Sequence, residues 1–272
     1  VGSEMCIRDR DLSHNSVSGD GARSLGRALR YHQLLVALDL ASNHLGSSGG
    51  VHILDALSQP DEEDVLAAQA YKEKEYDVDS LEEGSSLHSY ASGLKERAEK
   101  AIYYNCTLTQ LNLARNALGA DCAEVLAKVL RRNQCISSLD LSDNPLLFEP
   151  QHLTDETYVG IFGGTDVNYQ TGEEKDPLCA KRLPLECFDM LRLYNRSVLK
   201  LDLSFVELDE DACFAIGRYL SYKECALVEL ILSCCNIDAN RAEIIANQLA
   251  KSYEAPTLVA WDLSRNPLGD QG

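Results

Sequence analysis

One eleven-residue pattern, LxxLxLxxNxL, recurs along most of the chain and constrains its fold more than any other feature. Close copies occupy residues 35–45, 108–118, 136–146 and 258–268. Weaker copies occupy residues 11–17, 198–208 and 227–237, and in the last two Val206 and Cys235 stand at the asparagine position. Seven copies of one pattern predict an array of repeats, each of which is one supersecondary unit.

The spacing between asparagine positions sets the length of this unit. Asn15 and Asn43 are 28 residues apart, and the same interval separates Asn116 from Asn144. Between the strand motifs, apolar residues recur at helical spacing, as in Ala22, Leu25, Ala28 and Leu29. Each unit is therefore expected to be a short strand followed by a helix.

Neither a short strand nor a single amphipathic helix can bury its apolar face alone, so neighbouring units must stack. A helix is about 10 Å wide and a strand spacing is about 4.8 Å, so a stack of such units curves with its strands inside. The predicted fold is an α/β solenoid shaped like a horseshoe, with parallel strands on the concave face and helices on the convex face. A 28-residue period with "LDLSxN" and a full helix resembles the ribonuclease-inhibitor-like class of leucine-rich repeats.

Asparagine at the ninth position of the motif can bond its side-chain amide to backbone groups of the adjacent turn. We expect a structural ladder of these residues along the array. Cysteine is a variant of this position in the family that the repeats resemble, whereas Val206 cannot form a hydrogen bond and predicts a local irregularity. The ladder consists of Asn15, Asn43, Asn116, Asn144 and Asn266.

Two intervals exceed the period and predict insertions, at 58–102 and at 147–184. The first is expected to contain a helix, an acidic mobile segment near 76–92, and a second helix in which Ala98, Ala101 and Ile102 restore the helical stripe. This insertion is either a solvated excursion or an accessory docking segment for a basic partner. The second carries two β-prone runs around Gly163-Gly164, which indicate a hairpin or irregular loop, with a phosphate-binding loop as the alternative.

The first and last repeats are incomplete, and exposed ends of solenoids need capping elements, so we expect the chain to be part of a longer protein. Residues 1–10 fit neither a repeat nor a cap and resemble translated adapter sequence, so they are predicted to be a non-native leader. The leucine-rich-repeat domain is predicted to span 11–272.

Alternate residues of the strand motif face the concave surface, because side chains alternate along a strand. The central position is almost uniformly acidic, and it reads Asp11, Asp39, Asn112, Asp140, Asp202, Ile231 and Asp262. Carboxylates about 4.8 Å apart repel one another unless a basic group meets them. The row is therefore a candidate contact line for a basic protein, although solubility of the strands is an alternative explanation.

The last strand-exit position varies from repeat to repeat: His14, Ser42, Arg115, Asp143, Phe205, Cys234 and Arg265. Variation within otherwise similar repeats is where partner choice can be encoded. Aromatic and arginine side chains often dominate binding energy, so Phe205, Arg115 and Arg265 are predicted hot spots.

The chemistry of most enzymes is missing from this sequence. The six histidines are scattered and none accompanies a serine or cysteine motif, so we expect neither catalysis nor a small-molecule substrate. His32 aligns with Asn105, Asn133 and Asn195 at the helix end, which indicates a capping role. Asn105 and Asn195 also match the N-glycosylation pattern, which we attribute to chance.

Composition and charge exclude other classes of partner. A formal net charge of −18 disfavours nucleic acid and anionic membranes, and no apolar run suits a membrane span or a signal peptide. The ten cysteines have neither CxxC pairs nor regular spacing, so we expect free thiols, no bound metal or cofactor, and a cytoplasmic protein, with the cilium or cytoskeleton as alternatives.

Three functions fit these features. The first is a scaffold that binds a basic protein on its concave face. The second is the sensor segment of a nucleotide-binding leucine-rich-repeat receptor. The third is suggested by similarity to Ran GTPase-activating proteins, which are acidic solenoids, with Arg115 as the residue presented to the GTPase.

Overall fold

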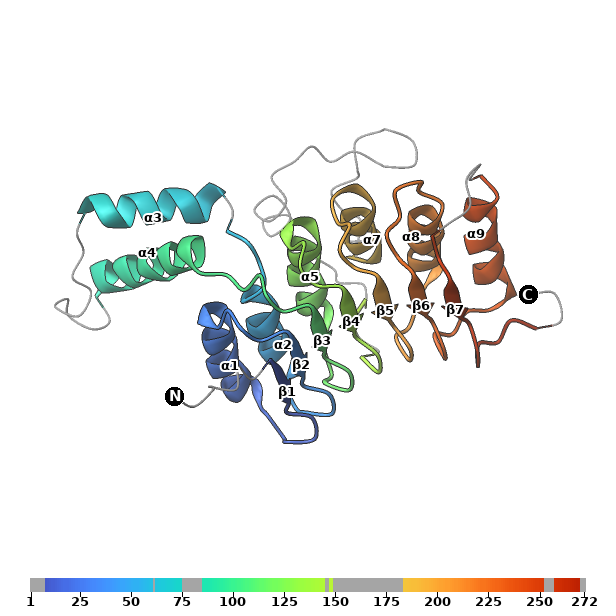
Figure 1. Ribbon diagram of the computed structural model, residues 1–272, viewed down its shortest axis with the longest axis horizontal. Helices are drawn as coiled ribbons and strands as arrows, with labels where there is room; N and C mark the ends of the chain where they lie inside the picture. The colour runs from blue at the N-terminus through green and yellow to red at the C-terminus, as the bar shows by residue number, and fades with distance from the viewer. Residues whose placement is uncertain are drawn as a thin grey trace, which may run out of the picture.

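The computed structural model describes residues 8–60, 62–74, 85–144, 147–148, 183–251 and 257–269. Within them, seven short strands form one parallel sheet in chain order (Figure 1). The strands are β1 (Asp9–Asp11), β2 (Ala37–Asp39), β3 (Gln110–Asn112), β4 (Ser138–Asp140), β5 (Lys200–Asp202), β6 (Glu229–Ile231) and β7 (Ala260–Asp262). One strand per repeat, each beside its neighbour in sequence, confirms the predicted solenoid. Because β1 begins at Asp9, the first strand includes two residues of the predicted leader.

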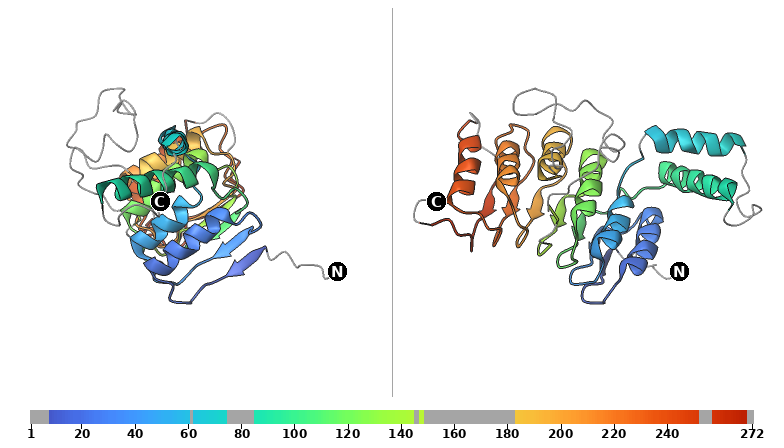
Figure 2. Two further views of the ribbon diagram at one scale, coloured as in Figure 1. Left: turned by 90° about the vertical axis from the view of Figure 1, so that its left-hand side faces the viewer. Right: turned by 180° about the vertical axis from the view of Figure 1, so that it is seen from behind.

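A row of helices lies along the other side of the strands (Figure 2). It consists of α1 (Gly19–Tyr31), α2 (Gly46–Asp55), α5 (Ala120–Arg132), α7 (Leu183–Leu193), α8 (Glu210–Leu220) and α9 (Ala239–Leu249). Consecutive members of the row pack on each other. Two of these helices start at the same motif position, where the side chains of Asp209 and Asp238 each accept a hydrogen bond from the backbone three residues on.

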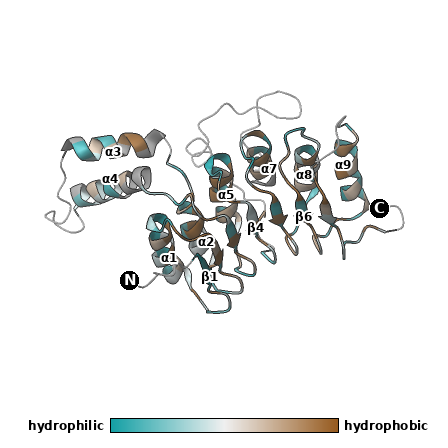
Figure 3. Cartoon of the chain, viewed as in Figure 1, coloured by the Kyte–Doolittle hydropathy of each residue, from teal (hydrophilic) through white to brown (hydrophobic). Residues whose placement is uncertain are grey.

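The register of the sheet places equivalent leucines side by side. Leu111 pairs with Leu38 on one side and with Leu139 on the other, and all three are buried. Each buried leucine contributes about 1.5–3 kcal/mol relative to an exposed one, so the array is held by its leucine rows. Figure 3 shows this as hydrophobic strands in the middle repeats, beside helices of mixed hydropathy. In the outermost strands the same position holds Arg10 and Trp261.

The motif asparagines connect neighbouring turns. Asn144 is fully buried, and its Nδ2 donates to the carbonyl oxygens of Leu113 at 3.1 Å and Leu141 at 2.9 Å. Its Oδ1 accepts hydrogen bonds from the backbone N–H groups of Asn116 at 3.1 Å and Leu118 at 3.0 Å. Each such side chain therefore satisfies backbone groups of two repeats at once.

Two positions depart from this ladder. Cys235 has only a weak donor, and its Sγ lies 3.0 Å from the carbonyl oxygen of Leu203. At Asn15, Asn116 and Cys235 the backbone N–H of the asparagine position donates to the asparagine side chain of the next repeat. The N–H of Val206 donates instead to Leu203, within its own repeat, because the next repeat offers Cys235 in place of an amide oxygen.

A second set of polar side chains fixes the turn between each helix and the following strand. The Oδ1 of Asn105 accepts from Leu108 N–H, and Nδ1 of His32 accepts from Leu35 N–H at the equivalent place. Asn105 and Asn195, which match the glycosylation pattern, are buried and have their amide groups engaged in such bonds. The fold thus uses these side chains as caps, as the alignment with His32 indicated.

The first insertion forms a helical hairpin that projects from the array, as Figures 1 and 2 show. Its helices are α3 (Glu62–Lys74) and α4 (Ser86–Ile102), and they pack on each other. Residues 76–84 of the expected mobile segment near 76–92 lie outside the described residues. From residue 86 onward the expectation is wrong, because α4 starts there. Ala98, Ala101 and Ile102 do lie in a second helix, α4, as expected, but this helix does not join the helix row. Within the described residues, α2 packs directly on α5, and α4 packs only on α3.

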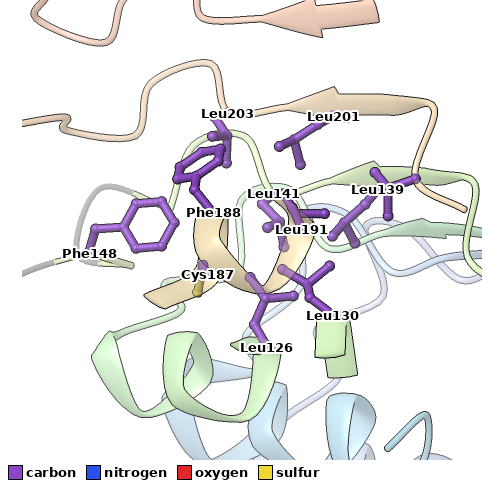
Figure 4. A pocket seen from close by; sticks show the side chains of 11 residues that line it. Leu126, Leu130, Leu139, Leu141, Phe148, Cys187, Phe188, Leu191, Leu201 and Leu203 are labelled. Carbon is purple, nitrogen blue, oxygen red and sulfur yellow. The ribbon is translucent and has the colours of Figure 1, made fainter. Parts of the chain in front are cut away.

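The predicted hairpin or loop around Gly163-Gly164, with its phosphate-binding alternative, lies outside the described residues. Residues at the two ends of the second insertion pack into the core. Leu147 and Phe148 are buried, and the ring of Phe148 lies 6.4 Å from that of Phe188. Phe148 and Phe188, together with leucines of α5, β4 and β5, surround a small apolar cavity of about 10 Å³ (Figure 4). Such a space barely holds one water and offers it no polar partner, so it is a packing defect rather than a ligand site.

The eight cysteines in the described part of the chain are free thiols, and most of them are buried. Burial raises the pKa of Cys122, Cys213 and Cys235 to about 12, which keeps these thiols protonated and unreactive at neutral pH. None of the described helices is long and apolar enough to cross a membrane.

Candidate protein-interaction surface

Three rows of side chains run along the array on the strand side. The carboxylate row is the last residue of each strand: Asp11, Asp39, Asn112, Asp140, Asp202, Ile231 and Asp262. The entry row lies two residues earlier on the same face: Asp9, Ala37, Gln110, Ser138, Lys200, Glu229 and Ala260. The turn row follows the strands: His14, Ser42, Arg115, Asp143, Phe205, Cys234 and Arg265.

The register brings the predicted carboxylates side by side. Asp140 pairs with Asp202 on one side and with Asn112 on the other, and Asn112 pairs with Asp39. Asp262 lies beyond the gap that Ile231 makes in the row. Asn112 moderates the repulsion in the middle, because its Nδ2 donates to Oδ2 of Asp39 at 3.1 Å.

Each polar member of this row also has a structural role that the sequence analysis missed. Oδ1 of Asp140 accepts the backbone N–H of Ser142 at 3.0 Å, and Asp202 accepts that of Ser204 at 2.9 Å. Asn112 accepts the equivalent N–H of Ala114 at 3.0 Å. One side-chain oxygen of each residue therefore shapes the strand exit, as in an Asx-turn. The sequence did contain a signal for this turn, namely Asp or Asn two residues before a small residue.

The second oxygen of each carboxylate is the acceptor that this surface presents to a binding partner. In Asp140, Asp202 and Asp262 the backbone N–H of the strand exit donates to Oδ1, so the strand exit does not use Oδ2. Strand spacing places successive repeats about 4.8 Å apart, so these oxygens form a line of acceptors. A line of this kind suits guanidinium and ammonium groups, which donate charge-assisted hydrogen bonds to carboxylates.

The electrostatics of the row are uneven along its length. Burial raises the pKa of the Asp140 carboxyl, hydrogen bonds from Ser142 oppose this, and the charges of Asp202 and Asp39 add to the rise. Hydrogen bonds from Ser264 lower the pKa of the exposed Asp262. The negative charge is thus most crowded at β4 and β5, where a cation would relieve most repulsion.

One cation already lies beside this crowded region, and the sequence analysis did not single it out. Lys200 of the entry row bonds Glu229 at 2.9 Å, and that hydrogen bond, aided by the charges of Asp202 and Asp140, raises its pKa. The signal was available, because residues two apart on a strand face the same side.

All seven members of the turn row have a left-handed backbone, with φ between 54° and 60°. This conformation costs a residue with a side chain about 1–2 kcal/mol, and the repeat imposes it on whatever residue stands there. Phe205 is 44% exposed at this place, and Arg265 is also exposed. Arg115 bonds Asp143 of the next repeat at 3.1 Å, so its charge is partly neutralised.

An open groove lies at the same edge between the second and third repeats. It is lined by Ser42, Asn43, His44, Gly46, Arg115, Asn116 and Ala117. Oδ1 of Asn116 is buried there and has no hydrogen-bond partner. The equivalent oxygens of Asn43, Asn144 and Asn266 each accept two backbone N–H groups. At Asn116, Gly46 at the start of α2 donates to the backbone oxygen instead.

No group of three or more histidine, cysteine or acidic side chains in the described ranges is arranged to hold a metal ion.

Comparison with known sequences places these repeats in a family. A family model described as Leucine Rich repeat matches residues 31–54, 104–127 and 254–272. The NACHT, LRR and PYD domains-containing protein 12 of Mus musculus is 27% identical over 98% of this chain and 26% of its own length. The ribonuclease inhibitor of Mus musculus is 26% identical over 96% of this chain and 52% of its own length.

A third relative, the Tonsoku-like protein of Bos taurus, is 27% identical over 89% of this chain and 16% of its own length. The chain thus spans about half or less of each of these relatives. The three matched segments coincide with repeats that the structure stacks through one continuous sheet. The chain thus carries leucine-rich repeats stacked as a solenoid, and these repeats are similar to those of ribonuclease inhibitor.

Proposed function

We propose that this chain is a protein-binding scaffold that captures a basic protein surface along its carboxylate row. Leucine-rich-repeat domains typically bind proteins, and relatives of the ribonuclease-inhibitor kind are generally binding proteins rather than enzymes. The proposal rests on the different roles of the two carboxylate oxygens in the row. In Asp140, Asp202 and Asp262, Oδ1 holds the strand exit, which leaves Oδ2 to meet a partner.

The contact is centred on β4 and β5. Asp140 and Asp202 are adjacent there, and their mutual repulsion is relieved when a guanidinium bridges them. Phe205 lies at the exposed end of the same repeat and supplies apolar contact area beside the charges. Lys200 and Glu229 form the border of this region through their ion pair.

The row itself suggests a clean test. Asn112 shows that an amide oxygen can hold the strand exit in place of a carboxylate. The triple variant Asp140→Asn, Asp202→Asn and Asp262→Asn should therefore keep the fold and lose three charges. The matched control removes three exposed carboxylates from the helices through Asp20→Asn, Glu210→Gln and Glu243→Gln.

Binding of a labelled arginine-rich peptide is measured by fluorescence anisotropy at several salt concentrations. The triple row variant should weaken binding by about tenfold or more, and the control variant by about twofold or less. Affinity should fall with rising salt for the wild type and less steeply for the row variant. Equal losses in the two variants would show that overall charge, rather than the carboxylate row, attracts the peptide.

A second candidate function is the sensor segment of a nucleotide-binding leucine-rich-repeat receptor. It is favoured by the similarity to a relative whose name includes a NACHT and a PYD domain beside the repeats. Sequencing the full transcript tests it: a P-loop motif upstream would support the receptor, and further repeats alone would leave the scaffold.

A further inference from the structure

The turns between helices and strands form a second surface of opposite character to the carboxylate row. We call it the tyrosine–arginine ridge, and define it as residues 30–34, 103–107, 131–135, 193–197 and 221–225. These 25 residues contain five of the chain's 12 tyrosines, and five basic residues against one acidic residue. Arg30 is buried and paired with Asp55 at 2.7 Å, and the other four basic residues still outnumber the acidic one. In a chain with 43 acidic and 25 basic residues, this edge is a local reversal of charge.

The segments of the ridge are joined from repeat to repeat. The rings of Tyr31 and Tyr103 lie 4.8 Å apart between the first two segments. Asn133 Nδ2 donates to the carbonyl oxygen of Asn105 at 3.4 Å between the second and the third. Gln134 Nε2 donates to the carbonyl oxygen of Tyr194 at 3.0 Å.

The last two segments are joined by an ion pair, in which Arg196 bonds Glu224 at 2.8 Å. Together with the bonds between the earlier segments, this makes the ridge one continuous surface along five repeats rather than a set of isolated turns.

Two arginines of the ridge lie over aromatic rings. Arg131 keeps its donors available there, whereas Arg196 donates to backbone carbonyl oxygens and to Glu224. The guanidinium of Arg131 lies 5.3 Å from the ring centroid of Tyr194, and that of Arg196 lies 5.5 Å from the ring of Tyr222. Stacking occupies the flat face of a guanidinium, whereas its N–H donors lie in the plane and point outward. Such an arginine is preorganised to bind a carboxylate with two parallel hydrogen bonds.

Much of the positive charge is not neutralised locally. Arg131 and Lys223 are exposed, and neither has a carboxylate within ion-pair distance among the described residues. Arg132 reaches only the carbonyl oxygen of Gln59, at 3.4 Å. Tyr194 is 47% exposed beside them and adds apolar contact area.

We propose that the tyrosine–arginine ridge binds an acidic polypeptide segment that runs along it from repeat to repeat. Charge complementarity identifies the occupant: carboxylates pair with Arg131, Arg132 and Lys223, and side chains between them lie on the tyrosine rings. A short acidic segment senses mainly the local charge, because physiological salt screens charges beyond about 8 Å. A nucleic acid is a longer and denser polyanion, and the net charge of −18 opposes its approach.

The test uses the whole chain and a short labelled peptide of alternating glutamate and tyrosine, with binding followed by fluorescence anisotropy. The ridge variant is Arg131→Gln with Arg132→Gln. Its control is Arg27→Gln with Lys128→Gln, which removes the same charge from exposed positions on the helices. The ridge variant should lose about tenfold or more in affinity, and the control less than about twofold.

Two further variants separate docking from a merely structural role. Tyr194→Phe keeps the ring beneath Arg131 and should bind as the wild type does, whereas Tyr194→Ala should weaken binding. Lys223→Gln leaves the stacked arginines in place and provides a second charge variant if the double variant unfolds.

The carboxylate-row variant Asp140→Asn with Asp202→Asn should bind the acidic peptide at least as tightly as the wild type, so failure of either proposal is distinguishable from failure of the other. The ridge proposal is overturned if the peptide does not bind, or if the ridge and control variants lose affinity equally. It is also overturned if a single-stranded oligonucleotide binds as tightly, with the same dependence on Arg131 and Arg132.

Discussion

Replacement of Asn144 by alanine should destabilise the fold far more than its single side chain suggests. Asn144 is fully buried and accepts the backbone N–H groups of Asn116 and Leu118. Alanine removes the acceptor and leaves both donors buried without a partner. An unsatisfied buried group costs about 1–3 kcal/mol, so the free energy of unfolding should fall by roughly 2–6 kcal/mol.

The matched control is Asn15→Ala at the same motif position. Asn15 is exposed, and its side chain donates one hydrogen bond, to the carbonyl oxygen of Ser13. Its loss should cost about 0.5–1 kcal/mol. Urea denaturation followed by far-ultraviolet circular dichroism compares the two variants, and hydrogen exchange should accelerate at the amides of Asn116 and Leu118 in Asn144→Ala. Equal stabilities of the two variants would refute the ladder as a major source of stability.

Three further predictions concern strain, thiol burial and pH. Phe205→Asn should stabilise the chain by about 0.5–1 kcal/mol in thermal unfolding, because asparagine tolerates a left-handed backbone, while it weakens binding at the carboxylate row; a loss of stability would contradict the strain. Cys122 and Cys213 should resist alkylation at pH 8 in the folded chain while Cys106 reacts, as read by mass spectrometry, since burial raises their pKa to about 12; rapid labelling of all three would show an open core. The folded-state pKa of Asp140 is raised, so its ionised form costs stability, and that cost disappears as pH falls through this pKa. Asp140→Asn should therefore stabilise the chain at pH 7 and lose this advantage in acid, and an unchanged advantage at low pH would contradict the assignment.

The architecture could be predicted because equivalent positions of the repeat motif give the register in which neighbouring strands pair. Motif spacing aligned Leu38 with Leu111 across the first insertion, and the sheet pairs these two residues directly. Leucines recur at fixed motif positions because they are buried between stacked repeats, and asparagines recur because they bond the backbone of the turns. The position of α4 could not be predicted in this way, because its apolar spacing matches that of a helix in the row although it packs on α3.

The candidate surface could be located from the sequence but not described. Side-chain alternation placed Asp140 and Asp202 on one face, and the register shows them adjacent. Their bonds to the strand exit and the partial burial of Asp140 depend on how far the chain turns after each strand, which side-chain alternation does not specify. The left-handed backbone at Phe205 is likewise imposed by the stacked turns, since phenylalanine has no preference for it.

Carboxyl footprinting is the most direct test of the carboxylate row as a binding surface. Carboxylates are labelled with glycine ethyl ester and a carbodiimide, with and without a saturating arginine-rich peptide, and labelling is read residue by residue by mass spectrometry. Asp140, Asp202 and Asp262 should be protected by the peptide, while Asp20 and Glu243 on the helices should react as before. Protection of the helix carboxylates, with the row still reactive, would contradict the account.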